Sequence, residues 1–434
     1  MSEQLLVLAD GRRMGCVEAR GQRLTFIYDT DWLSSPNPYP LSLSMPLVVP
    51  EHGHRVVEAF LWGLLPDNGT TLMRWGQKFQ VSPRNPFKLI SHVGEDCAGA
   101  VQFVRPERWT DLLAESKAPR VHWLTKKELS ERLRLLVEDA SATRTARDEG
   151  QFSLAGAQPK TAFLFDPDTK RWGVPRGRTP TTHILKPATG EFEGFTQNEH
   201  FCLLLAESLS LPVTKSWVED FGGLPVIVVE RYDRVVQRGV VHRLHQEDMC
   251  QALGLRPHGK YQSQGGPSPR QVAELLWDHS AQARADVRHF ADALIFNWLM
   301  AGTDAHAKNY SLLLSARPAA RLAPLYDLAS SIPYAKQIDP RKAKLAMKIG
   351  RHYRIREVSR RDWDRCAREL RLRPNDLHER IDSMMERLPE SARAVADDMG
   401  QRKLAHRTVT SLVDSLPAWI SKQKEQLSKT KSKV

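Results

Sequence analysis

The sequence predicts an α+β protein whose strands are concentrated in its first half and whose helices dominate its end. Residues 1–110 contain short apolar strands separated by turn residues. Residues 150–260 mix short strands with one amphipathic helix, and the last hundred residues are rich in Arg, Glu and Leu. Strands and helices that are segregated along the chain in this way are typical of the α+β class.

The composition is that of an ordinary folded protein. Of the 434 residues, 41% are apolar and 26% are charged, which permits a sizeable core and excludes a disordered or fibrous chain. No apolar run approaches the roughly 20 residues of a membrane-spanning helix, and the N-terminus lacks the pattern of a signal peptide. We therefore expect a cytoplasmic protein with no membrane partner.

Cysteine usage and charge narrow the function classes further. Five cysteines, far apart and without a CxxC pair, argue against a disulfide framework and a cysteine zinc site. Lys plus Arg exceed Asp plus Glu by 63 − 51 = 12, so binding to nucleic acid or another polyanion is permitted. The basic final residues, 421–434, are more typical of a solvated tail.

Local patterns predict the elements of the first 150 residues. We expect two strands, a short helix that ends near Pro66, an irregular connector, and a helix that Thr125 caps with Glu128 three residues on. The strands lie at 5–10 and 24–29 with a linker at 10–22, and the other three elements lie at 59–68, 105–120 and 124–140.

The next 150 residues alternate strands, loops and helices. A hairpin that turns at 166–168, a strand that Pro187 closes and a second buried strand are expected, together with two helices and a flexible loop. These lie, in chain order, at 161–175 (hairpin), 182–187 (strand), 198–209 (helix), 224–233 (strand), 262–270 (loop) and 288–301 (helix).

The segment GTDAHAKNYSLLL at 302–314 carries the strongest chemical signal. Asp304 and Asn309 are five residues apart, between an apolar helix and a short strand, and Asp327 follows another apolar strand. Protein kinases place a base Asp and a metal-binding Asn at this spacing, and a later Asp on Mg²⁺. A hairpin would bring all three groups to one rim. The alternative is that Asp304 caps a turn and Lys308 pairs with a surface acid.

Three upstream features fit the same scheme, although each alone is weak. Lys186 ends a strand where a kinase keeps its phosphate-binding lysine, and Glu199 opens the next helix and could pair with it. The loop 153–160 contains small residues and a lysine, so its backbone could approach phosphates closely. By itself, this segment would be interpreted as an ordinary turn. Residues 230–232 follow a strand, as a nucleotide hinge would, although their spacing alone favours an ordinary strand end.

Other catalytic and metal patterns are weaker. The pairs His52/His54 and His242/His245 lack the three or four ligands of a zinc site. No GxSxG motif supports a hydrolase.

Taken together, the ordered motifs resemble the HipA family of toxin kinases, from HipBA-type toxin–antitoxin modules. The resemblance extends over nearly the whole chain. Its N-terminal motifs are SLSMPL (42–47), LWGLLPDN (61–68) and GEDCAGAVQF (94–103). Its core motifs are FSLAGAQPKTAF (152–163), HILKP (183–187), NEHFCLLLAESL (198–209), VERYDR (229–234), RLHQEDMCQALG (243–254), KYQSQGGPS (260–268), GTDAHAKNYSLLL (302–314), PLYDLASSIPY (324–334) and KLAMKIG (344–350).

The resemblance implies a protein-kinase-like bilobal core with an N-terminal β-rich subdomain and a mainly helical C-terminal lobe. It places the β-rich subdomain at 1–110, a helical connector at 111–149, the kinase core at 150–395 and a helical, basic tail at 396–434.

The family resemblance also implies roles for individual residues, with ATP and Mg²⁺ as cofactors. Asp304 would be the catalytic base, Asn309 and Asp327 would hold Mg²⁺, Lys186 would pair with Glu199, and Ser153 would be the autophosphorylated serine. The residues implied to contact ATP are Ala155, Gly156, Ala157, Gln158, Pro159, Lys160, Lys186, Glu230, Arg231, Tyr232, His306, Lys308, Asn309 and Asp327. A phosphate on Ser153 would repel bound phosphates and switch the kinase off.

The implied activity is phosphorylation of an aminoacyl-tRNA synthetase, with glutamate-tRNA ligase first, which arrests translation and growth (persistence). The implied partners are a HipB-like helix-turn-helix antitoxin dimer and, through that complex, operator DNA, which would make the bound protein nucleoid-associated. Two departures stand out. Pro159 stands where acidic residues are common, and the stretch from Pro187 to Asn198 is short for the substrate-contacting activation segment.

Two other functions stay open from the sequence. One is a catalytically silent, DNA-associated co-repressor subunit, although Lys186, Asp304, Asn309 and Asp327 are all present. The other is a kinase that acts on a small molecule or a lipid.

Overall fold

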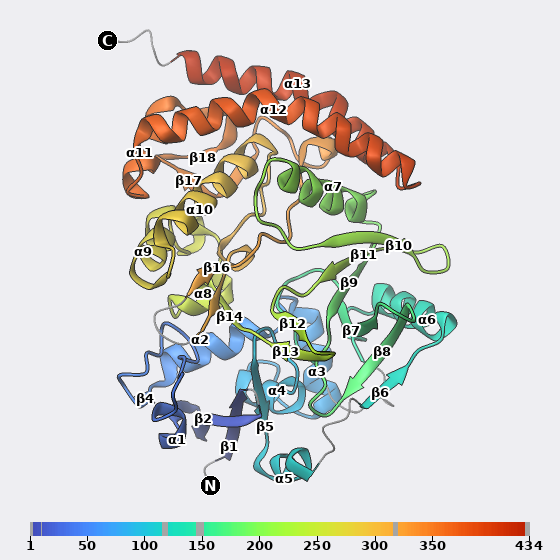
Figure 1. Cartoon of the computed structure of the whole chain (residues 1–434), viewed down its shortest axis with the longest axis vertical. Helices are drawn as coiled ribbons and strands as arrows, with labels where there is room; N and C mark the ends of the chain where they lie inside the picture. The colour runs from blue at the N-terminus through green and yellow to red at the C-terminus, as the bar shows by residue number, and fades with distance from the viewer. Residues whose placement is uncertain (1–2, 10, 115–119, 145–151, 316–319, 430–434) are drawn as a thin grey trace. The chain divides into compact units, whose positions relative to one another are not determined.

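The computed structural model describes residues 3–9, 11–114, 120–144, 152–315 and 320–429, in two compact units (Figure 1). The first unit combines residues 1–187, 219–258 and 311–319, and the second combines 188–218, 259–310 and 320–434. Strands dominate the first unit and helices the second, which confirms the α+β class. Among the described helices, none is both long and apolar enough to cross a membrane.

A five-stranded antiparallel sheet opens the first unit, in the order β4-β3-β2-β1-β5. Its central strand β2 occupies the segment that we had predicted as a linker. Met14 and Val17 in it are fully buried, and Gly15 has no room for a side chain because a Cβ would lie 2.2 Å from the Ile27 oxygen. The strands are β1 (Glu3–Ala9), β2 (Arg12–Arg20), β3 (Arg23–Tyr28), β4 (Glu51–His52) and β5 (Val101–Val104).

Helices pack against this sheet. Phe60 and Trp75 join Phe26 and Phe103 of the strands in one buried cluster. The predicted connector at 105–120 contains a helix, α5, because Leu112 packs against Leu8 and so holds a turn with little periodicity of its own. The helices are α1 (Thr30–Leu33), α2 (His54–Leu64), α3 (Gly69–Phe79), α4 (Pro86–Val93) and α5 (Pro106–Ala114).

A second, six-stranded sheet has the order β10-β11-β9-β7-β8-β6. The hairpin predicted around residues 166–168 is confirmed, since Asp166 pairs with Arg171. The predicted capping box of Thr125 and Glu128 is also present at the start of α6 (Lys126–Glu138). The strands are β6 (Arg120–Trp123), β7 (Thr161–Asp166), β8 (Arg171–Arg176), β9 (His183–Pro187), β10 (Ser216–Asp220) and β11 (Pro225–Glu230).

Two smaller strand pairs complete the first unit. Strands β12 (Arg234–Gln237) and β13 (Val240–Arg243) form a hairpin, whose two turn residues, Arg238 and Gly239, both have positive φ, as a type I′ turn requires. Strand β14 (His245–Asp248) pairs with β15 (Ser311–Leu314) and leads into α8 (Met249–Ala252).

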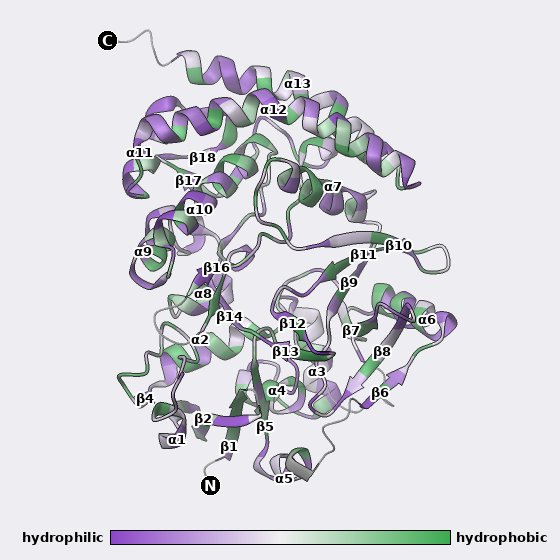
Figure 2. Cartoon of the chain, viewed as in Figure 1, coloured by the Kyte–Doolittle hydropathy of each residue, from purple (hydrophilic) through white to green (hydrophobic). Residues whose placement is uncertain are grey.

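The second unit is mainly helical, and the side chains of Trp298 and Trp363 meet edge to face in its core. Figure 2 shows hydrophilic and hydrophobic residues alternating along α12 and α13, as expected for helices with one buried face. The prediction that the last hundred residues are helices missed one strand pair, β17–β18. The helices are α7 (Phe195–Ser208), α9 (Pro269–His279), α10 (Ala283–Leu299), α11 (Arg360–Glu369), α12 (Pro374–Gln401) and α13 (Arg407–Ser428), and the strands are β16 (Arg321–Leu322), β17 (Lys344–Ile349) and β18 (His352–Arg354).

A buried ionic cluster lies in the first unit, where two aspartates meet three arginines. Arg234 is 3.0 Å from both Asp96 and Asp233, Arg231 is 2.8 Å from Asp233, and Arg243 is 3.4 Å from Asp96. Burial alone would raise the pKa of Asp96, but the arginines hold it well below its usual range. Burial also lowers the pKa of Arg234 to about 10. The aspartates are therefore the counterions that keep these arginines charged.

The same cluster fixes two segments of backbone. Arg231 donates to the Cys97 oxygen at 2.8 Å, and the Gly99 amide donates to Asp233 at 2.7 Å. The main-chain oxygen of Asp96 accepts a hydrogen bond from the Ser153 amide at 3.1 Å. The start of the 153–160 loop is thus tied directly to the residue at the centre of the cluster.

A single buried carboxyl, Glu247 on β14, holds the segment around Ser42. Its two oxygens accept from the Ser42 hydroxyl at 2.5 Å and from the Leu43 amide at 2.8 Å. Burial raises the pKa of Glu247 to about 8, with a smaller contribution from Asp248. The carboxyl is therefore largely protonated in the folded protein at neutral pH.

We predict that Asp96→Asn destabilises the protein by about 3–5 kcal/mol, because it leaves three buried arginines with one counterion. Urea unfolding followed by tryptophan fluorescence measures the loss. The exposed Asp31→Asn is the matched control and should change stability by less than about 0.5 kcal/mol. Equal unfolding midpoints for the two variants would contradict a structural role for the cluster.

The raised pKa of Glu247 predicts a pH dependence of stability. Its folded pKa lies above its unfolded value, so its contribution is complete below about pH 4.5 and is lost as the pH rises to about 8. Relative to Glu247→Gln, wild type should lose up to about 1.4 kcal/mol per pH unit across that window. Unfolding free energies of both proteins at pH 5 and pH 8 test this, and parallel pH profiles would refute it.

Candidate active site

The segment 304–309 in the second unit begins where the chain turns sharply out of α10. Ala301 has a positive φ, and the Gly302 amide donates to the Asn297 oxygen at 2.7 Å. A Cβ on Gly302 would lie 2.2 Å from the Asn297 side-chain oxygen, so only glycine fits there. This turn ends the helix and starts the polar segment.

Asp304 and Asn309 lie together at the two ends of one tight loop. The Asn309 side-chain amide donates to the Asp304 main-chain oxygen at 3.0 Å, and the His306 amide donates to the same oxygen at 2.8 Å. Asp304 is exposed, whereas His306, Lys308 and Asn309 are buried. The loop thus presents one carboxylate to solvent on a rigid support.

We had predicted that Asp327 directly follows a strand, but it lies in an irregular segment. The preceding strand β16 has only two residues, and Asp327 itself has φ 57°. Aspartate tolerates this left-handed conformation better than most residues. The neighbouring Tyr326 donates to the Lys308 oxygen at 2.7 Å, which joins this segment to the 304–309 loop.

The chain just after Asp327 is held by helix α7. The Asn198 side chain donates to the Ser330 oxygen at 2.8 Å and accepts from the Ser330 amide at 3.2 Å. The Ser330 and Ser331 hydroxyls donate to the oxygens of Met300 and Ala301 at the end of α10. The two ends of the site are therefore fixed to the same helix terminus.

The chemistry of these donors suits Mg²⁺. Asn309 and Asp327 offer oxygen ligands, and Mg²⁺ usually takes one or two protein ligands together with water and phosphate oxygens. Over the described parts of the chain, no group of three His, Cys, Asp or Glu side chains could hold a metal by itself. A metal held here would thus depend on the oxygens of a bound phosphate.

Sequence reasoning missed Tyr261, whose hydroxyl donates to the Asp304 carboxylate. Tyr261 lies in the segment KYQSQGGPS, which the resemblance includes without giving it a role. The available signal was the position of this motif among the others, since the two residues are 43 apart in sequence.

In the first unit, the loop from Ala155 to Lys160 is closed on itself and packed inward. The Lys160 ammonium donates to the Ala155 oxygen at 2.8 Å, and the Asp67 amide donates to the Gly156 oxygen at 3.1 Å. Ser153, just before the loop, is fully buried, and its hydroxyl donates to the Leu64 oxygen at 2.6 Å.

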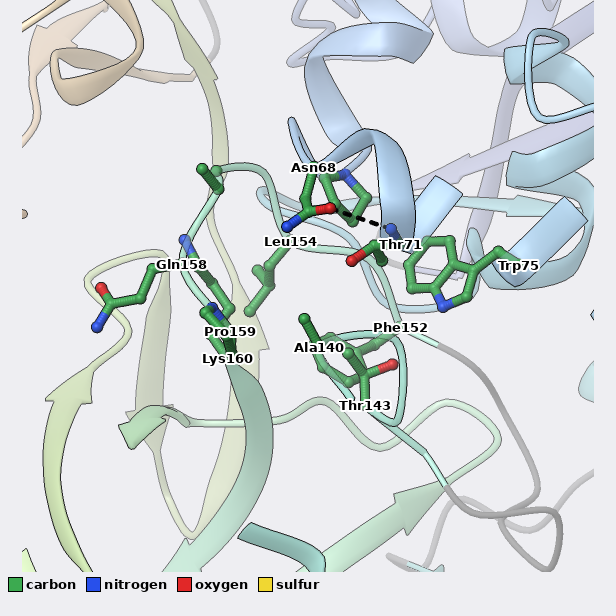
Figure 3. A pocket seen from close by; sticks show the side chains of 13 residues that line it. Asn68, Thr71, Trp75, Ala140, Thr143, Phe152, Leu154, Gln158, Pro159 and Lys160 are labelled. Atoms are coloured by element: carbon green, nitrogen blue, oxygen red, sulfur yellow. Dashed lines mark hydrogen bonds between the residues drawn. The ribbon is translucent and has the colours of Figure 1, made fainter. Parts of the chain in front are cut away.

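A small cavity lies beneath this loop. Figure 3 shows Leu154 and Pro159 of the loop near Asn68, Thr71 and Trp75, which belong to the start and the middle of α3. The cavity holds about 20 Å³, which is room for roughly one water molecule. The loop therefore packs closely against α3 and leaves little empty space.

The other residues assigned to nucleotide binding lie on strands of the first unit. Lys186 is buried on β9, where it pairs with Ile227. The Arg231 guanidinium belongs to the ionic cluster and its amide donates to the Thr182 oxygen at 2.9 Å, while the Tyr232 hydroxyl donates to Gln246 at 2.7 Å.

Glu230 ends β11, opposite His183 of β9, and is partly buried. Glu199 lies on α7 of the second unit, and its pairing with Lys186 stays a prediction. Gln158 and Ala157 line the cavity beneath the loop with Lys160.

Comparisons with known proteins give one consistent family. The HipA N-terminal domain matches residues 5–104, and the HipA-like C-terminal domain matches residues 152–392. The chain is 36% identical over 413 residues to Sinorhizobium fredii Y4mE, a protein named as a proposed kinase, with 94% of this chain and 95% of that protein covered.

A second relative is the serine/threonine-protein kinase toxin HipA of Shewanella oneidensis, 30% identical over 70% of this chain and 69% of that protein. Among solved structures, the complex of Shewanella oneidensis HipA with HipB and its operator DNA aligns with a TM-score of 0.81 and 24% identity. That alignment covers 98% of this chain and 97% of the other, and it supports the fold.

We predict that Gly156→Ala loosens the 153–160 loop. The new Cβ would lie 2.4 Å from the Lys160 ammonium, and φ is +109°, so the loop must shift and break its bond to Ala155. Gly223→Ala is the matched control, because its φ is +87° and nothing lies within 4 Å. Limited proteolysis should cut the loop several-fold faster in Gly156→Ala alone. Equal proteolysis rates in the two variants would contradict this prediction and would show that the Lys160 side chain can move aside without loosening the loop.

Proposed function

Since the chain belongs to the HipA family, we propose that it is a Mg²⁺-ATP-dependent serine/threonine protein kinase and the toxin of a toxin–antitoxin pair. One observation carries the proposal: an exposed carboxylate, Asp304, stands on a loop closed by Asn309 five residues later and joined to the segment that holds Asp327. Phosphoryl transfer to a hydroxyl needs this set of oxygen groups.

In the proposed mechanism, the Asp304 carboxylate accepts a hydrogen bond from the substrate serine or threonine and takes its proton as the oxygen attacks the γ-phosphorus of ATP. The bond from phosphorus to the β-bridging oxygen breaks, and ADP leaves. Asn309 and Asp327 would hold Mg²⁺, which supplies charge neutralisation at the phosphates. Lys186 and the backbone of 155–160 would bind phosphates, and residues 230–232 would flank the adenine.

The buried position of Ser153 supports autophosphorylation as the off-switch. Its hydroxyl is bonded to the Leu64 oxygen in a site without solvent, so the loop must leave that site before Ser153 can receive a phosphate. A phosphate of about −1.5 to −2 charges cannot return to such a dry site without partners. Phosphorylation would therefore keep the loop out of its nucleotide-binding position.

The family and its named members support the partners. The Shewanella oneidensis complex contains HipA, HipB and operator DNA, and we propose a similar helix-turn-helix antitoxin and operator for this chain, which would be cytoplasmic or associated with the nucleoid. The net charge of +12 suits contacts with DNA phosphates. The proposed substrate is an aminoacyl-tRNA synthetase, with glutamate-tRNA ligase as the first candidate.

We predict that incubation with Mg²⁺-ATP adds one phosphate to Ser153 of wild type, because Asp304 can accept the serine proton. Asp304→Asn should slow this transfer by about 10²–10⁴-fold, since it removes a general base. Intact mass and phosphosite mapping measure both proteins in parallel. Expression of Asp304→Asn should also leave growth unaffected.

The same experiment separates the alternatives. Wild type that binds ATP but carries no phosphate would favour the silent co-repressor. Growth arrest by Asp304→Asn as strong as that by wild type would contradict the kinase toxin. Phosphate transfer to no protein in a lysate, together with ATP turnover, would favour a small-molecule or lipid kinase.

A further inference from the structure

We propose that Tyr261 is a positioning residue for the phosphoryl transfer, whose hydroxyl holds the Asp304 carboxylate in the orientation that accepts the substrate hydroxyl. This inference rests on the proposed function and deepens it at the same site. It assigns a role to the motif KYQSQGGPS, which the mechanism above leaves unused.

The contact itself is direct. The Tyr261 hydroxyl donates to one oxygen of the Asp304 carboxylate. The Tyr261 ring also meets His306 edge to face, with 5.1 Å between the ring centres and an angle of 87° between the rings. Since His306 is buried within the 304–309 loop, the phenol ring is supported on the same loop whose carboxylate it contacts.

The segment that carries Tyr261 is built to hold it still. The main-chain amides of Gln264 and Gly266 both donate to the main-chain oxygen of Tyr261 at 2.9 Å, which closes a tight turn. A Cβ on Gly266 would lie 2.3 Å from the Gly259 oxygen, so the turn requires glycine at this position.

Two further bonds fix this turn to its surroundings. The Lys260 oxygen accepts from the Ala307 amide at 3.1 Å, so the turn and the catalytic loop are bonded through their backbones. The Gln262 side-chain oxygen accepts from the Lys348 amide at 2.8 Å, which anchors the turn to β17. The turn that carries Tyr261 is therefore fixed both to the 304–309 loop and to β17.

Without this bond, an exposed carboxylate such as Asp304 would exchange between rotamers and form its hydrogen bonds with water. A hydrogen bond from a fixed phenol selects one orientation and directs one oxygen toward Tyr261, which leaves the second oxygen for the substrate hydroxyl.

The test is Tyr261→Phe, which removes the hydroxyl and keeps the ring against His306. With labelled ATP, the maximal rate of transfer to protein should fall about tenfold, as for the loss of one hydrogen bond to a charged group, with the half-saturating ATP concentration unchanged. In an Asp304→Asn background, Tyr261→Phe should cause no further loss of rate, because the carboxylate that the hydroxyl orients is then absent. A purely structural role would slow the Asp304→Asn protein as well.

Tyr353→Phe is the matched control, because it removes another tyrosine hydroxyl of the second unit, on β18, that has no place in the mechanism. It should leave the rate unchanged. A Tyr261→Phe protein with the wild-type rate would overturn the proposal. A faster Tyr261→Phe would also overturn it, since the hydroxyl would then compete with substrate.

The double variant separates this inference from the kinase proposal. A further fall in rate when Tyr261→Phe is added to Asp304→Asn overturns the Tyr261–Asp304 pairing even if the kinase is active. A wild-type protein that transfers no phosphate rejects the kinase proposal, whatever the two variants do.

Discussion

The buried cluster of Asp96, Asp233 and three arginines is the constraint on which the first unit depends. Its five charged groups lie out of water, where each is tolerable only because the others are present. The cluster joins the segment between α4 and β5, the end of strand β11 and, through the Asp96 main-chain oxygen, the backbone of Ser153. The loop proposed to bind phosphate thus begins at a fixed point, while Gly156 and Lys160 set its closed form. The proposed switch at Ser153 requires this loop to leave its site while its support stays in place.

The second unit uses hydrogen bonds where the first uses buried charge. Asn309 closes the 304–309 loop, Tyr326 joins it to the segment of Asp327, and Asn198 fixes the chain that follows. The exposed Asp304 carboxylate stands on this hydrogen-bonded frame and accepts a hydrogen bond from Tyr261. The positive φ of Asp327 fits this arrangement, since strained backbone persists only where its surroundings determine it.

The sequence reveals local rules better than distant pairings. Thr125 and Glu128, the hairpin at 166–171 and the Asp304–Asn309 spacing are all visible within a few residues, and each appears in the structure. Strand β2 was missed because charged residues at its ends resemble a linker. The pairs Asp96–Arg234 and Tyr261–Asp304 are 138 and 43 residues apart, and no local pattern links them. Arg231 of VERYDR, which the resemblance places beside adenine, has its side chain in this cluster. That placement could not be foreseen either, because the other cluster residues are spread along the sequence.

A structure of the protein with Mg²⁺ and a non-hydrolysable ATP analogue tests the central claim most directly. The account predicts Mg²⁺ bound by the Asn309 amide oxygen and the Asp327 carboxylate, with Asp304 bonded to Tyr261 and not to the metal. It also predicts phosphate oxygens in contact with the backbone of residues 155–160 and with Lys186. Metal coordinated by Asp304, or a nucleotide bound without contact to Asn309 and Asp327, would contradict it.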